Sequence, residues 1–371
     1  MSIHFPDESM KVDGRAYRSL WREGRVVQVV DQTRLPHQFA ALALHSMDEV
    51  ADAIRHMVVR GAPLIGVSAA YGLALALDTD PSDAGLDRAI ARLAATRPTA
   101  VNLRWALGAM HDAVAPLPPA QRGAAAWSRA DRLADDDVRT NAAIGAHGAA
   151  LLRERWDALG RPDSLHVLTH CNAGWLACID WGTALAAIYQ AFDAGLPLHV
   201  WVDETRPRNQ GASLTTWELA RHGVPNTLVA DNAGGHLMRA GKVHACIVGA
   251  DRVTARGDVC NKIGTYLKAL AAADNGVPFY VAMPVSTIDW TVDDGQREIE
   301  IEERPATEVT HLWGRSDDGQ VQRVQLAPDG TAAANPAFDV TPARLVTALV
   351  SERGVVPASV TGLAAWRVPP R

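Results

Sequence analysis

The chain has 371 residues, 48% of them hydrophobic, and its 36 basic and 42 acidic side chains give a net charge of −6. This length predicts two domains with a large core, and the acidic balance without a basic run argues against a nucleic-acid partner. Four cysteines in a chain of this size do not indicate a disulfide framework, and the N-terminus lacks an apolar signal core. We therefore expect a cytoplasmic protein.

The first part of the chain is predicted to be mostly helical, with a little sheet. Residues 26–31 form a short apolar run typical of a strand. Residues 46–59 place apolar side chains on one face of an amphipathic helix. The apolar stretch 62–77 predicts another helix, with Pro63 in its first turn. We expect this stretch to be too short and too interrupted by Gly and Pro to span a membrane.

In the second part, apolar strands alternate with helix-length segments. The predicted strands are 165–168, 198–202, 227–230, 245–249 and 279–282, and the predicted helices are 175–192, 211–221, 233–240 and 261–273. Repeated β-α-β alternation predicts a parallel sheet with right-handed crossovers. Near-continuous apolar strands are typical of strands buried on both faces.

These patterns together predict an α/β protein of two domains. Residues 1–152 are expected to form a smaller, mostly helical N-terminal domain carrying a little sheet. Residues 153–371 are expected to form a Rossmann-like C-terminal domain, with residues 153–164 as the linker. Near the end, the polar, Gly- and Pro-containing residues 311–334 predict a surface loop or hairpin, and residues 341–353 predict a last helix.

Polar and reactive residues recur directly after the predicted strands. Cys171, Asp203, Asp231 and Asp251 each lie at or just beyond the end of one. Open α/β sheets bind their ligands beyond the carboxyl ends of their strands. The sequence therefore predicts a functional crevice along this edge of the sheet.

The segment around Asp251 combines an acid with a possible anion site. Asp251 could cap a loop, but partial desolvation next to an apolar strand would raise the pKa of its carboxyl toward use as a general acid. Asn261 and Lys262 are predicted to open the next helix. Its unpaired N–H groups, with the charge of Lys262, would suit a phosphate.

Cys171 and Gln210 each have two interpretations. Cys171 could be a small buried apolar residue, the commonest state of a free cysteine. It also precedes a predicted helix start, where the helix dipole would lower the pKa of its thiol. Gln210 could cap the helix that follows it or hydrogen-bond a ligand.

The arginines of the N-terminal part are ambiguous on their own. Arg60, Gly61 and Ala62 precede a helix start and would point at anything bound there, but taken alone the pattern favours a helix–turn–helix corner. Arg97 lies at a break between helical segments, where a surface charge or a helix cap is common.

No metal or nucleotide cofactor is expected. His166 and His170 are four residues apart, but they fall on a predicted strand and not on a helix, where that spacing would suit a metal. Neither GxxxxGK[ST] nor GxGxxG follows a predicted strand, which also argues against a nicotinamide-dependent oxidoreductase.

Six motifs resemble one known family. They are RGAPLIG (60–66), THCNAG (169–174), VDETRPRNQGASLTTWEL (202–219), GADRVTARGDVCNKIGTY (249–266), IEIEERPATEVTH (299–311) and NPAFDVTP (335–342). In this order, from about residue 10 to about residue 355, the chain resembles the methylthioribose-1-phosphate isomerase family of methionine salvage. That family is homologous to regulatory subunits of the translation-initiation guanine-nucleotide exchange complex and to archaeal ribose-1,5-bisphosphate isomerase.

The resemblance implies a role for each matching residue. Cys171 matches the catalytic cysteine and Asp251 the proton-donor aspartate, while the substrate-binding positions fall on Arg60, Gly61, Ala62, Arg97, Gln210, Asn261 and Lys262. The resemblance also implies a Rossmann-like C-terminal domain, a homodimer, a small-molecule sugar phosphate as partner, and no metal or organic cofactor.

The implied reaction is the conversion of 5-methylthioribose 1-phosphate to 5-methylthioribulose 1-phosphate. Asp251 would be the general acid, and Cys171 the base or a stabiliser of charge. Trp175 and Ala233 depart from the family's usual residues and leave the substituent at C5 open. The alternatives are an isomerase of 5-deoxyribose 1-phosphate or ribose 1,5-bisphosphate, and a non-catalytic subunit that senses a sugar phosphate or nucleotide. The presence of both Cys171 and Asp251 argues against a pure sensor.

Overall fold

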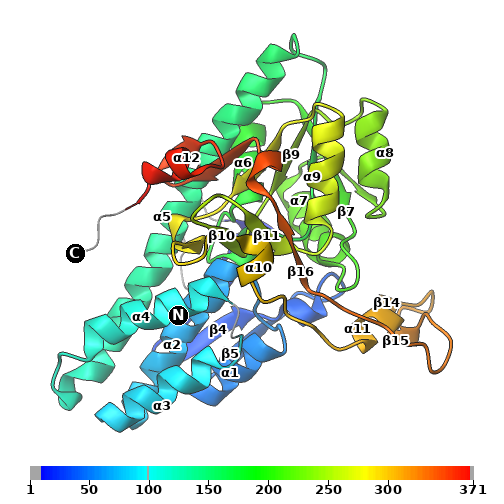
Figure 1. The fold of residues 1–371 in the computed structure, drawn as a ribbon. Helices are drawn as coiled ribbons and strands as arrows, with labels where there is room; N and C mark the ends of the chain where they lie inside the picture. The colour runs from blue at the N-terminus through cyan, green and yellow to red at the C-terminus, as the bar shows by residue number, and fades with distance from the viewer. Residues whose placement is uncertain (1–9, 98–99, 368–371) are drawn as a thin grey trace.

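A computed structural model describes residues 10–97 and 100–367 (Figure 1). The chain first forms a helical region with a small sheet, and then a larger region built around a parallel sheet. This arrangement confirms the predicted α/β fold class.

The N-terminal region is mostly helical, as predicted. Its elements are β1 (Lys11–Val12), β2 (Arg15–Ala16), β3 (Leu20–Glu23), β4 (Val26–Val30), β5 (Ala41–Leu44), α1 (Met47–Arg55), α2 (Ala62–Thr79), α3 (Asp83–Ala94), α4 (Val101–Val114) and α5 (Pro119–Ala158). β3, β4 and β5 form a small antiparallel sheet. The side chain of Ser46 caps α1 by accepting a hydrogen bond from the backbone N–H of Glu49, which satisfies a donor that the helix leaves free.

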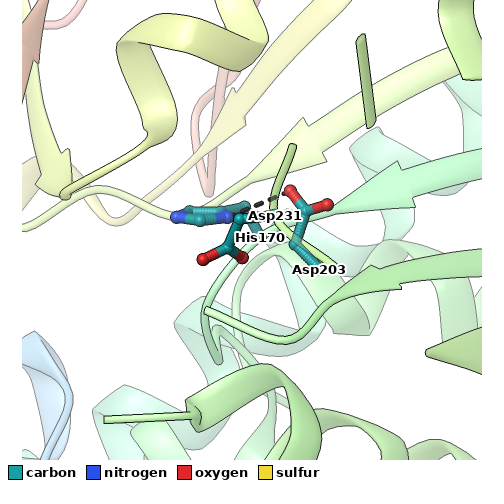
Figure 2. A group of neighbouring side chains, drawn as sticks. All are labelled: His170, Asp203 and Asp231. Carbon is teal, nitrogen blue, oxygen red and sulfur yellow. Dashed lines mark hydrogen bonds and ion pairs between the residues drawn. The ribbon is translucent and has the colours of Figure 1, made fainter. Parts of the chain in front are cut away.

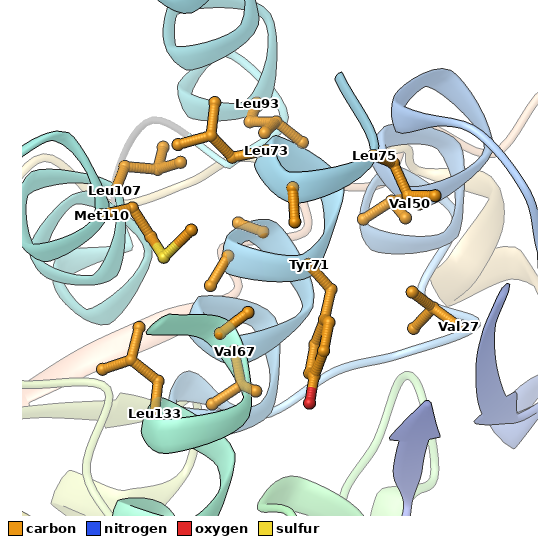
Figure 3. Packing of buried hydrophobic residues seen from close by; sticks show 14 of the residues in the cluster. Val27, Val50, Val67, Tyr71, Leu73, Leu75, Leu93, Leu107, Met110 and Leu133 are labelled. Carbon is orange, nitrogen blue, oxygen red and sulfur yellow. The ribbon is translucent and has the colours of Figure 1, made fainter. Parts of the chain in front are cut away.

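Helix α2 forms the centre of the first hydrophobic core (Figure 3). Val67, Tyr71 and Leu73 point from it toward side chains of the surrounding helices and strands. By length and composition this helix of 18 residues is long and apolar enough to cross a membrane, which corrects the expectation from the sequence. However, 83% of it is buried inside the protein, as expected for the core helix of a folded domain.

Helix α5 corrects the predicted linker. It runs unbroken for 40 residues, so residues 153–158 are helical. The segment is Ala-rich and has no proline after its first turn, and such a composition favours helix propagation. Trp127 in its first half packs into the first core, whereas Ile144 and Leu152 in its second half pack into the second core. The two regions thus share one long helix.

The C-terminal region is built on a seven-stranded sheet with the order β18-β17-β12-β9-β6-β7-β8. Its strands are β6 (Leu165–Thr169), β7 (Leu198–Asp203), β8 (Asn226–Val229), β9 (Ala245–Val248), β12 (Phe279–Ala282), β17 (Ala348–Ser351) and β18 (Gly354–Val356). All neighbours pair in parallel except β17 and β18. The connecting helices include α6 (Ala184–Asp193), α7 (Thr216–His222), α8 (Ala233–Arg239) and α9 (Thr265–Asp274).

A second sheet was not predicted. It has the order β13-β10-β11-β16 and consists of β10 (Arg252–Thr254), β11 (Val259–Lys262), β13 (Ile288–Asp289) and β16 (Phe338–Thr341). Asn261 and Lys262 therefore end a strand and do not open a helix, and α9 begins only after Gly264, whose φ of 101° ends the strand. Glycine adopts this conformation without the steric cost that other residues meet.

Two further predicted helices are also corrected. The predicted last helix over residues 341–353 is instead the end of β16, a 3-10 turn (Ala343–Leu345) and β17. The apolar run of β17 pairs with β12 at the sheet, and this tertiary pairing outweighs the helix-start signal of Thr341 and Pro342. The predicted helix over 175–192 begins only at Ala184, after a 3-10 turn at Trp175–Ala177.

The remaining elements lie at the periphery. β14 (His311–Arg315) and β15 (Val321–Gln325) form an antiparallel hairpin, which confirms the predicted hairpin over residues 311–334. It projects from the rest of the molecule (Figure 1). Short helices α10 (Gly295–Glu298), α11 (Thr307–Thr310) and α12 (Val360–Ala364) complete the fold.

Three histidines meet near the start of the central strands. His166 on β6 pairs in register with His199 on β7, and their ring centroids are 5.3 Å apart. His244 lies 5.4 Å from His166, and its Nδ1 accepts the backbone N–H of His166. Burial lowers the pKa of each imidazole, and His166 further lowers the pKa of the other two.

This histidine cluster should make folding sensitive to acid. The unfolded chain takes up these protons near the ordinary pKa of 6.5, but the folded protein does so only at lower pH. Between the lower pKa of the folded state and the ordinary value of about 6.5, the unfolded state binds more protons than the folded state. The contribution of the three histidines to the free energy of unfolding therefore falls as pH falls through about 6.5. We expect urea unfolding to show a smaller loss of stability in His199→Gln than in the natural chain between about pH 7.5 and about pH 5.5. His45→Gln, at an exposed histidine outside the cluster, serves as the control, and equal losses in both variants would contradict the prediction.

Candidate active site

A cavity is lined by residues of both regions. Arg60, Gly61, Ala62 and Arg97 come from the N-terminal region, and Cys171, Gln210, Asp251 and Lys262 come from the C-terminal region. Cys171 follows β6, and Asp251 follows β9, at the carboxyl ends of neighbouring parallel strands. The fold therefore brings these side chains, which are far apart in the sequence, to a single cavity.

The backbone of Cys171 is held in an unusual conformation. Its φ is 66°, a left-handed value that costs a non-glycine residue about 1–3 kcal/mol and is often found at functional sites. The hydroxyl of Thr205 accepts the backbone N–H of Cys171 at 2.8 Å. The hydroxyl of Thr215 donates to the Cys171 carbonyl at 2.6 Å. Two threonines from the next β-α connection thus fix the thiol at the cavity wall.

The expected lowering of the Cys171 pKa is wrong. No helix begins directly after Cys171, since α6 starts only at Ala184, so the dipole of a helix N-terminus is not available to the thiol. Burial raises the pKa of Cys171, while the charges of Arg60 and Lys262 act in the opposite direction. The thiol therefore retains its proton to higher pH than an ordinary cysteine does.

Asp251 has the raised pKa that was expected of it. Its side chain is half-buried and opens onto the cavity, and its backbone N–H donates to the carbonyl of Cys260 at 3.0 Å. Burial raises the pKa of Asp251, and the positive charges of Lys262, Arg97 and Arg60 lower it only in part. A carboxyl in such a setting retains its proton at higher pH than usual and can donate it.

Lys262 reaches the cavity from strand β11 and not from a helix N-terminus. Its ammonium donates to the carbonyl of Ala337 at 2.9 Å and lies 4.9 Å from the ring centroid of Phe338. Burial lowers the pKa of Lys262. Asn261 does not line the cavity, and its amide donates to the hydroxyl of Thr265 in the first turn of α9. The anion site that was expected here therefore has no helix N-terminus, but the positive charge of Lys262 is present in the cavity.

Arg60 and Gly61 join the two regions. The guanidinium of Arg60 donates to the side-chain carbonyl of Asn172 and, at 2.7 Å, to its backbone carbonyl. Gly61 has a φ of 98°, and a Cβ placed on it would lie 2.5 Å from backbone atoms of Ala177. Only glycine therefore allows the start of α2 to approach the C-terminal region this closely. Ala62 is the first residue of α2.

Arg97 belongs to a chain of alternating charges. It binds Glu302 at 2.9 Å, and the other carboxylate oxygen of Glu302 binds Arg304 at 2.9 Å. Arg304 in turn binds Glu308 at 2.7 Å, and Glu308 binds Arg208 at 3.2 Å. The segment containing Glu302 and Glu308 thus links Arg97 to the loop that leads to Gln210.

Gln210 presents an unpaired acceptor. The residue is buried, and its Oε1 has no hydrogen-bond partner among the described residues. Gly211 follows it, and a Cβ at that position would lie 1.6 Å from the carbonyl oxygen of Asp203. The close packing of this turn directs Gln210 to the cavity, where its amide can bind a ligand hydroxyl.

Several lining residues were missed from the sequence. Arg252 and Cys260 line the cavity beside Asp251 and Lys262, and the apolar side chains of Met57, Ile65, Ile299 and Phe338 cover other parts of its wall. Arg252 is adjacent to Asp251 in the sequence, and Phe338 lies inside a motif that had been noted. Cys260, Ile65 and Ile299 also lie inside noted motifs, so membership in a motif was the available signal.

Trp175 and Ala233, the two departures that left the C5 substituent open, do not line the cavity. Trp175 is buried in the second core against Trp217, and Ala233 is the first residue of α8. Neither of these two departures from the family pattern would therefore contact a ligand bound in the cavity.

His170, Asp203 and Asp231 form a group close enough to hold a metal ion, with their ligand atoms within 4.8 Å of one another (Figure 2). Protein groups already occupy most of these atoms. His170 Nδ1 lies 3.1 Å from Asp203 and its Nε2 lies 2.8 Å from the Ile263 carbonyl. Backbone N–H groups of residues 205 and 206 donate to Asp231. We interpret the group as a set of hydrogen bonds that connects the loop that carries Cys171 to the segment after Lys262.

Comparison with known protein families gives a match over most of the chain. Residues 58–358 match the model described as the initiation factor 2 subunit family. The methylthioribose-1-phosphate isomerase of Paramagnetospirillum magneticum is 61% identical over 356 residues, which cover 95% of this chain and 98% of that protein. The methylthioribose-1-phosphate isomerase of Methylobacterium nodulans is 64% identical over 356 residues, covering 95% and 97%.

Solved structures share the fold. The 5-methylthioribose 1-phosphate isomerase of Pyrococcus horikoshii OT3 superposes with a TM-score of 0.82 at 38% identity, covering 98% of both chains. The delta subunit of the translation initiation factor eIF-2B from A. fulgidus superposes with a TM-score of 0.75, also at 38% identity, covering 92% of this chain and 96% of that one. The same fold therefore occurs both in an isomerase and in an initiation-factor subunit, so the fold alone does not distinguish between them.

Proposed function

Since the chain belongs to the initiation factor 2 subunit family and, within it, to the methylthioribose-1-phosphate isomerases, we propose that it isomerises 5-methylthioribose 1-phosphate to 5-methylthioribulose 1-phosphate in methionine salvage. Asp251 acts as the general acid, and Cys171 acts as the base or stabilises charge. Arg60, Gly61, Ala62, Arg97, Gln210, Asn261 and Lys262 bind or order the substrate.

One observation carries this proposal. A carboxyl and a thiol, both with raised pKa values, line one cavity together with four cationic side chains. The cations are Arg60, Arg97, Arg252 and Lys262. Arginine and lysine bind phosphate oxygens through charge-assisted hydrogen bonds, and a neutral carboxyl can protonate a sugar oxygen. A purely regulatory sensor would need the cations but neither reactive group.

The chemistry requires an acid because the anomeric oxygen carries the phosphate, so the ring cannot open to a free aldehyde. Asp251 gives its proton to the ring oxygen as the bond between that oxygen and C1 breaks. The hydrogen on C2 then moves to C1, and the C2 hydroxyl gives its proton to the Asp251 carboxylate as the ketone forms. If C2 loses its hydrogen as a proton, the thiolate of Cys171 accepts it and returns it to C1, which requires that the thiol first release its own proton to solvent. If the hydrogen moves as a hydride, Cys171 stabilises the electron-poor centre at C1.

The lining favours an apolar substituent at C5. Met57, Ile65, Ile299 and Phe338 supply apolar wall, which suits a methylthio group better than the second phosphate of ribose 1,5-bisphosphate, because burying an unpaired charge is costly. 5-Deoxyribose 1-phosphate remains an alternative substrate with a smaller apolar substituent.

Phosphorus NMR of the purified protein with methylthioribose 1-phosphate tests the function. We expect the signal of the sugar 1-phosphate to be replaced by that of the 1-phosphate ketose. Parallel reactions with 5-deoxyribose 1-phosphate and ribose 1,5-bisphosphate rank the three substrates. Turnover of none of them would refute the isomerase, and faster turnover of the bisphosphate would refute the assignment of the apolar wall.

Lys262→Ala should mainly weaken substrate binding. The variant removes a buried cation from the cavity, and a hydrogen bond to a charged group contributes about 1.5–3 kcal/mol, so we expect KM to rise roughly 10- to 100-fold. The steady-state rate over a range of substrate concentrations separates KM from kcat. Lys242→Ala, which removes an exposed lysine outside the cavity, is the matched control. Unchanged KM in Lys262→Ala would show that the phosphate lies elsewhere.

The family resemblance also supports a proposal about assembly, location and domain roles. We propose that the chain works as a homodimer in the cytoplasm, with residues 1–152 acting as a domain that clamps the substrate against the catalytic domain, residues 153–371. Sedimentation equilibrium of the full chain measures the assembly, and a monomer at all concentrations would contradict the homodimer.

A further inference from the structure

A buried carboxylate lies beneath the loop that carries Cys171. Glu218 on helix α7 is 1% exposed and accepts four hydrogen bonds. The donors are the side-chain amide of Asn172 at 2.8 Å, the backbone N–H of Trp175 at 3.0 Å, the backbone N–H of Leu176 at 3.2 Å and the hydroxyl of Tyr189 at 3.0 Å. All but the Tyr189 hydroxyl belong to one segment, which begins directly after Cys171.

The approach of this segment to Glu218 is unusually close. A Cβ placed on Gly174 would lie 1.8 Å from a carboxylate oxygen of Glu218, so only glycine lets the loop lie against the carboxylate. Burial raises the pKa of Glu218 to about 7, although its hydrogen bonds to Asn172 and Tyr189 act in the opposite direction. Burying a carboxylate is costly even when it is hydrogen-bonded, and an apolar side chain could fill this space without that cost.

Asn172 carries the contact across to the N-terminal region. While its Nδ2 donates to Glu218, its Oδ1 and its backbone carbonyl both accept from the guanidinium of Arg60. The orientation of the Asn172 amide is therefore fixed on both sides, with acceptor atoms toward Arg60 and donor atoms toward Glu218. Asn172 also lies next to Cys171 in the chain, so the same contact bears on the thiol.

We propose that Glu218 is a positioning residue of the active site, which fixes the 172–176 segment and, through Asn172, orients the guanidinium of Arg60 toward the sugar phosphate. This role rests on the proposed function and adds to it a residue that does not itself touch substrate. Glu218 does not line the cavity, so its effect on the reaction passes through Asn172 and through the loop.

Glu218→Gln is the principal test. The variant keeps the shape of the side chain but replaces one acceptor oxygen with an NH₂ group, which faces donors and cannot satisfy them. We expect kcat/KM to fall about 10²-fold, as small displacements of positioned groups can cause, with KM rising roughly tenfold because Arg60 loses its alignment. A merely structural role would lower the amount of active enzyme, and with it the apparent kcat, but would leave KM unchanged.

Tyr189→Phe is the matched control. It removes a buried hydroxyl that donates to the same carboxylate, so it lowers stability by a similar mechanism, but it leaves all contacts between Glu218 and the loop. We expect its KM to equal that of the natural chain. Thermal unfolding of both variants checks that their losses of stability are comparable.

Asn172→Ala breaks the same connection at its centre and keeps the proposal testable if Glu218→Gln does not fold. It should also raise KM, and its effect on kcat/KM should not add to that of Glu218→Gln in the double variant, because both remove one interaction chain. Unchanged KM in Glu218→Gln, or in Asn172→Ala alone, or fully additive effects would overturn the proposal. Absence of isomerase activity in the natural chain would instead refute the proposed function.

Discussion

Asp251→Asn is expected to abolish turnover while leaving substrate affinity within a few-fold of the natural value. Asparagine matches the size of the aspartic acid and retains its polarity, but it has no proton to give to the ring oxygen. Loss of a general acid typically lowers the rate roughly 10²–10⁴-fold. Turnover is measured by phosphorus NMR, and affinity by calorimetric titration of the inactive variant with methylthioribose 1-phosphate.

The control for this variant is Glu300→Gln. Glu300 also lines the cavity, but its side chain is exposed, so the same chemical change there should leave turnover largely intact. Full activity of Asp251→Asn would remove Asp251 from the chemistry. Loss of both affinity and turnover would instead indicate that Asp251 organises the cavity.

The raised pKa of Asp251 also predicts a pH dependence. Burial holds the proton on the carboxyl at higher pH than usual, so kcat/KM should fall on the alkaline side as pH rises through the pKa of Asp251 in the free enzyme. The same shift affects folding with a defined sign. Because the folded state binds this proton more tightly than the unfolded state, its contribution to stability is present at low pH and is lost as pH rises through the folded pKa.

The sequence predicted the parallel sheet well because local and tertiary preferences agree there. The apolar runs that contain β6 and β9 are buried on both faces of the sheet, so composition alone indicates their state. Cys171 and Asp251 follow these two neighbouring strands. The carboxyl-end rule for open α/β sheets therefore predicted their meeting at one cavity.

The second sheet could not be predicted in the same way. Lys262 lies at the end of β11, where it pairs with Phe338, a residue far along the chain. Because no local pattern encodes a partner at that distance, the segment was interpreted as the start of the helix that follows it. Thr341 was misinterpreted for the same reason: it carries a helix-start signal, but its strand β16 pairs with β11.

The predicted pKa of Cys171 was wrong because the start of the next helix was predicted too early in the chain. The predicted low pKa required a helix N-terminus beside the thiol, but a 3-10 turn and further loop separate Cys171 from α6. Burial then dominates and raises the pKa. The cavity thus combines a carboxyl and a thiol of raised pKa with the cationic side chains of Arg60, Arg97, Arg252 and Lys262.

Cys171→Ser is expected to lower turnover roughly 10²–10⁴-fold, whichever of its two roles applies. A serine hydroxyl is much less acidic than a thiol and is less polarizable, so it is both a poorer base once ionised and a poorer stabiliser of an electron-poor carbon. Serine fits the space of the cysteine, and the hydrogen bonds of Thr205 and Thr215 to the backbone at this position remain available. The initial rate of ketose formation measures the effect.

Cys260→Ser separates a catalytic effect from a general sensitivity of the cavity to thiol loss. Cys260 lines the same cavity and is also buried, but the proposed mechanism gives its thiol no step, so its variant should retain most of the activity. Substrate labelled with deuterium at C2 then distinguishes the two roles of Cys171 in the natural chain. Exchange of the label with solvent shows the proton route, in which Cys171 is the proposed base. Complete retention at C1 is the result expected of a hydride shift, in which Cys171 stabilises charge. Equal rates in Cys171→Ser and Cys260→Ser would remove the Cys171 thiol from both mechanisms.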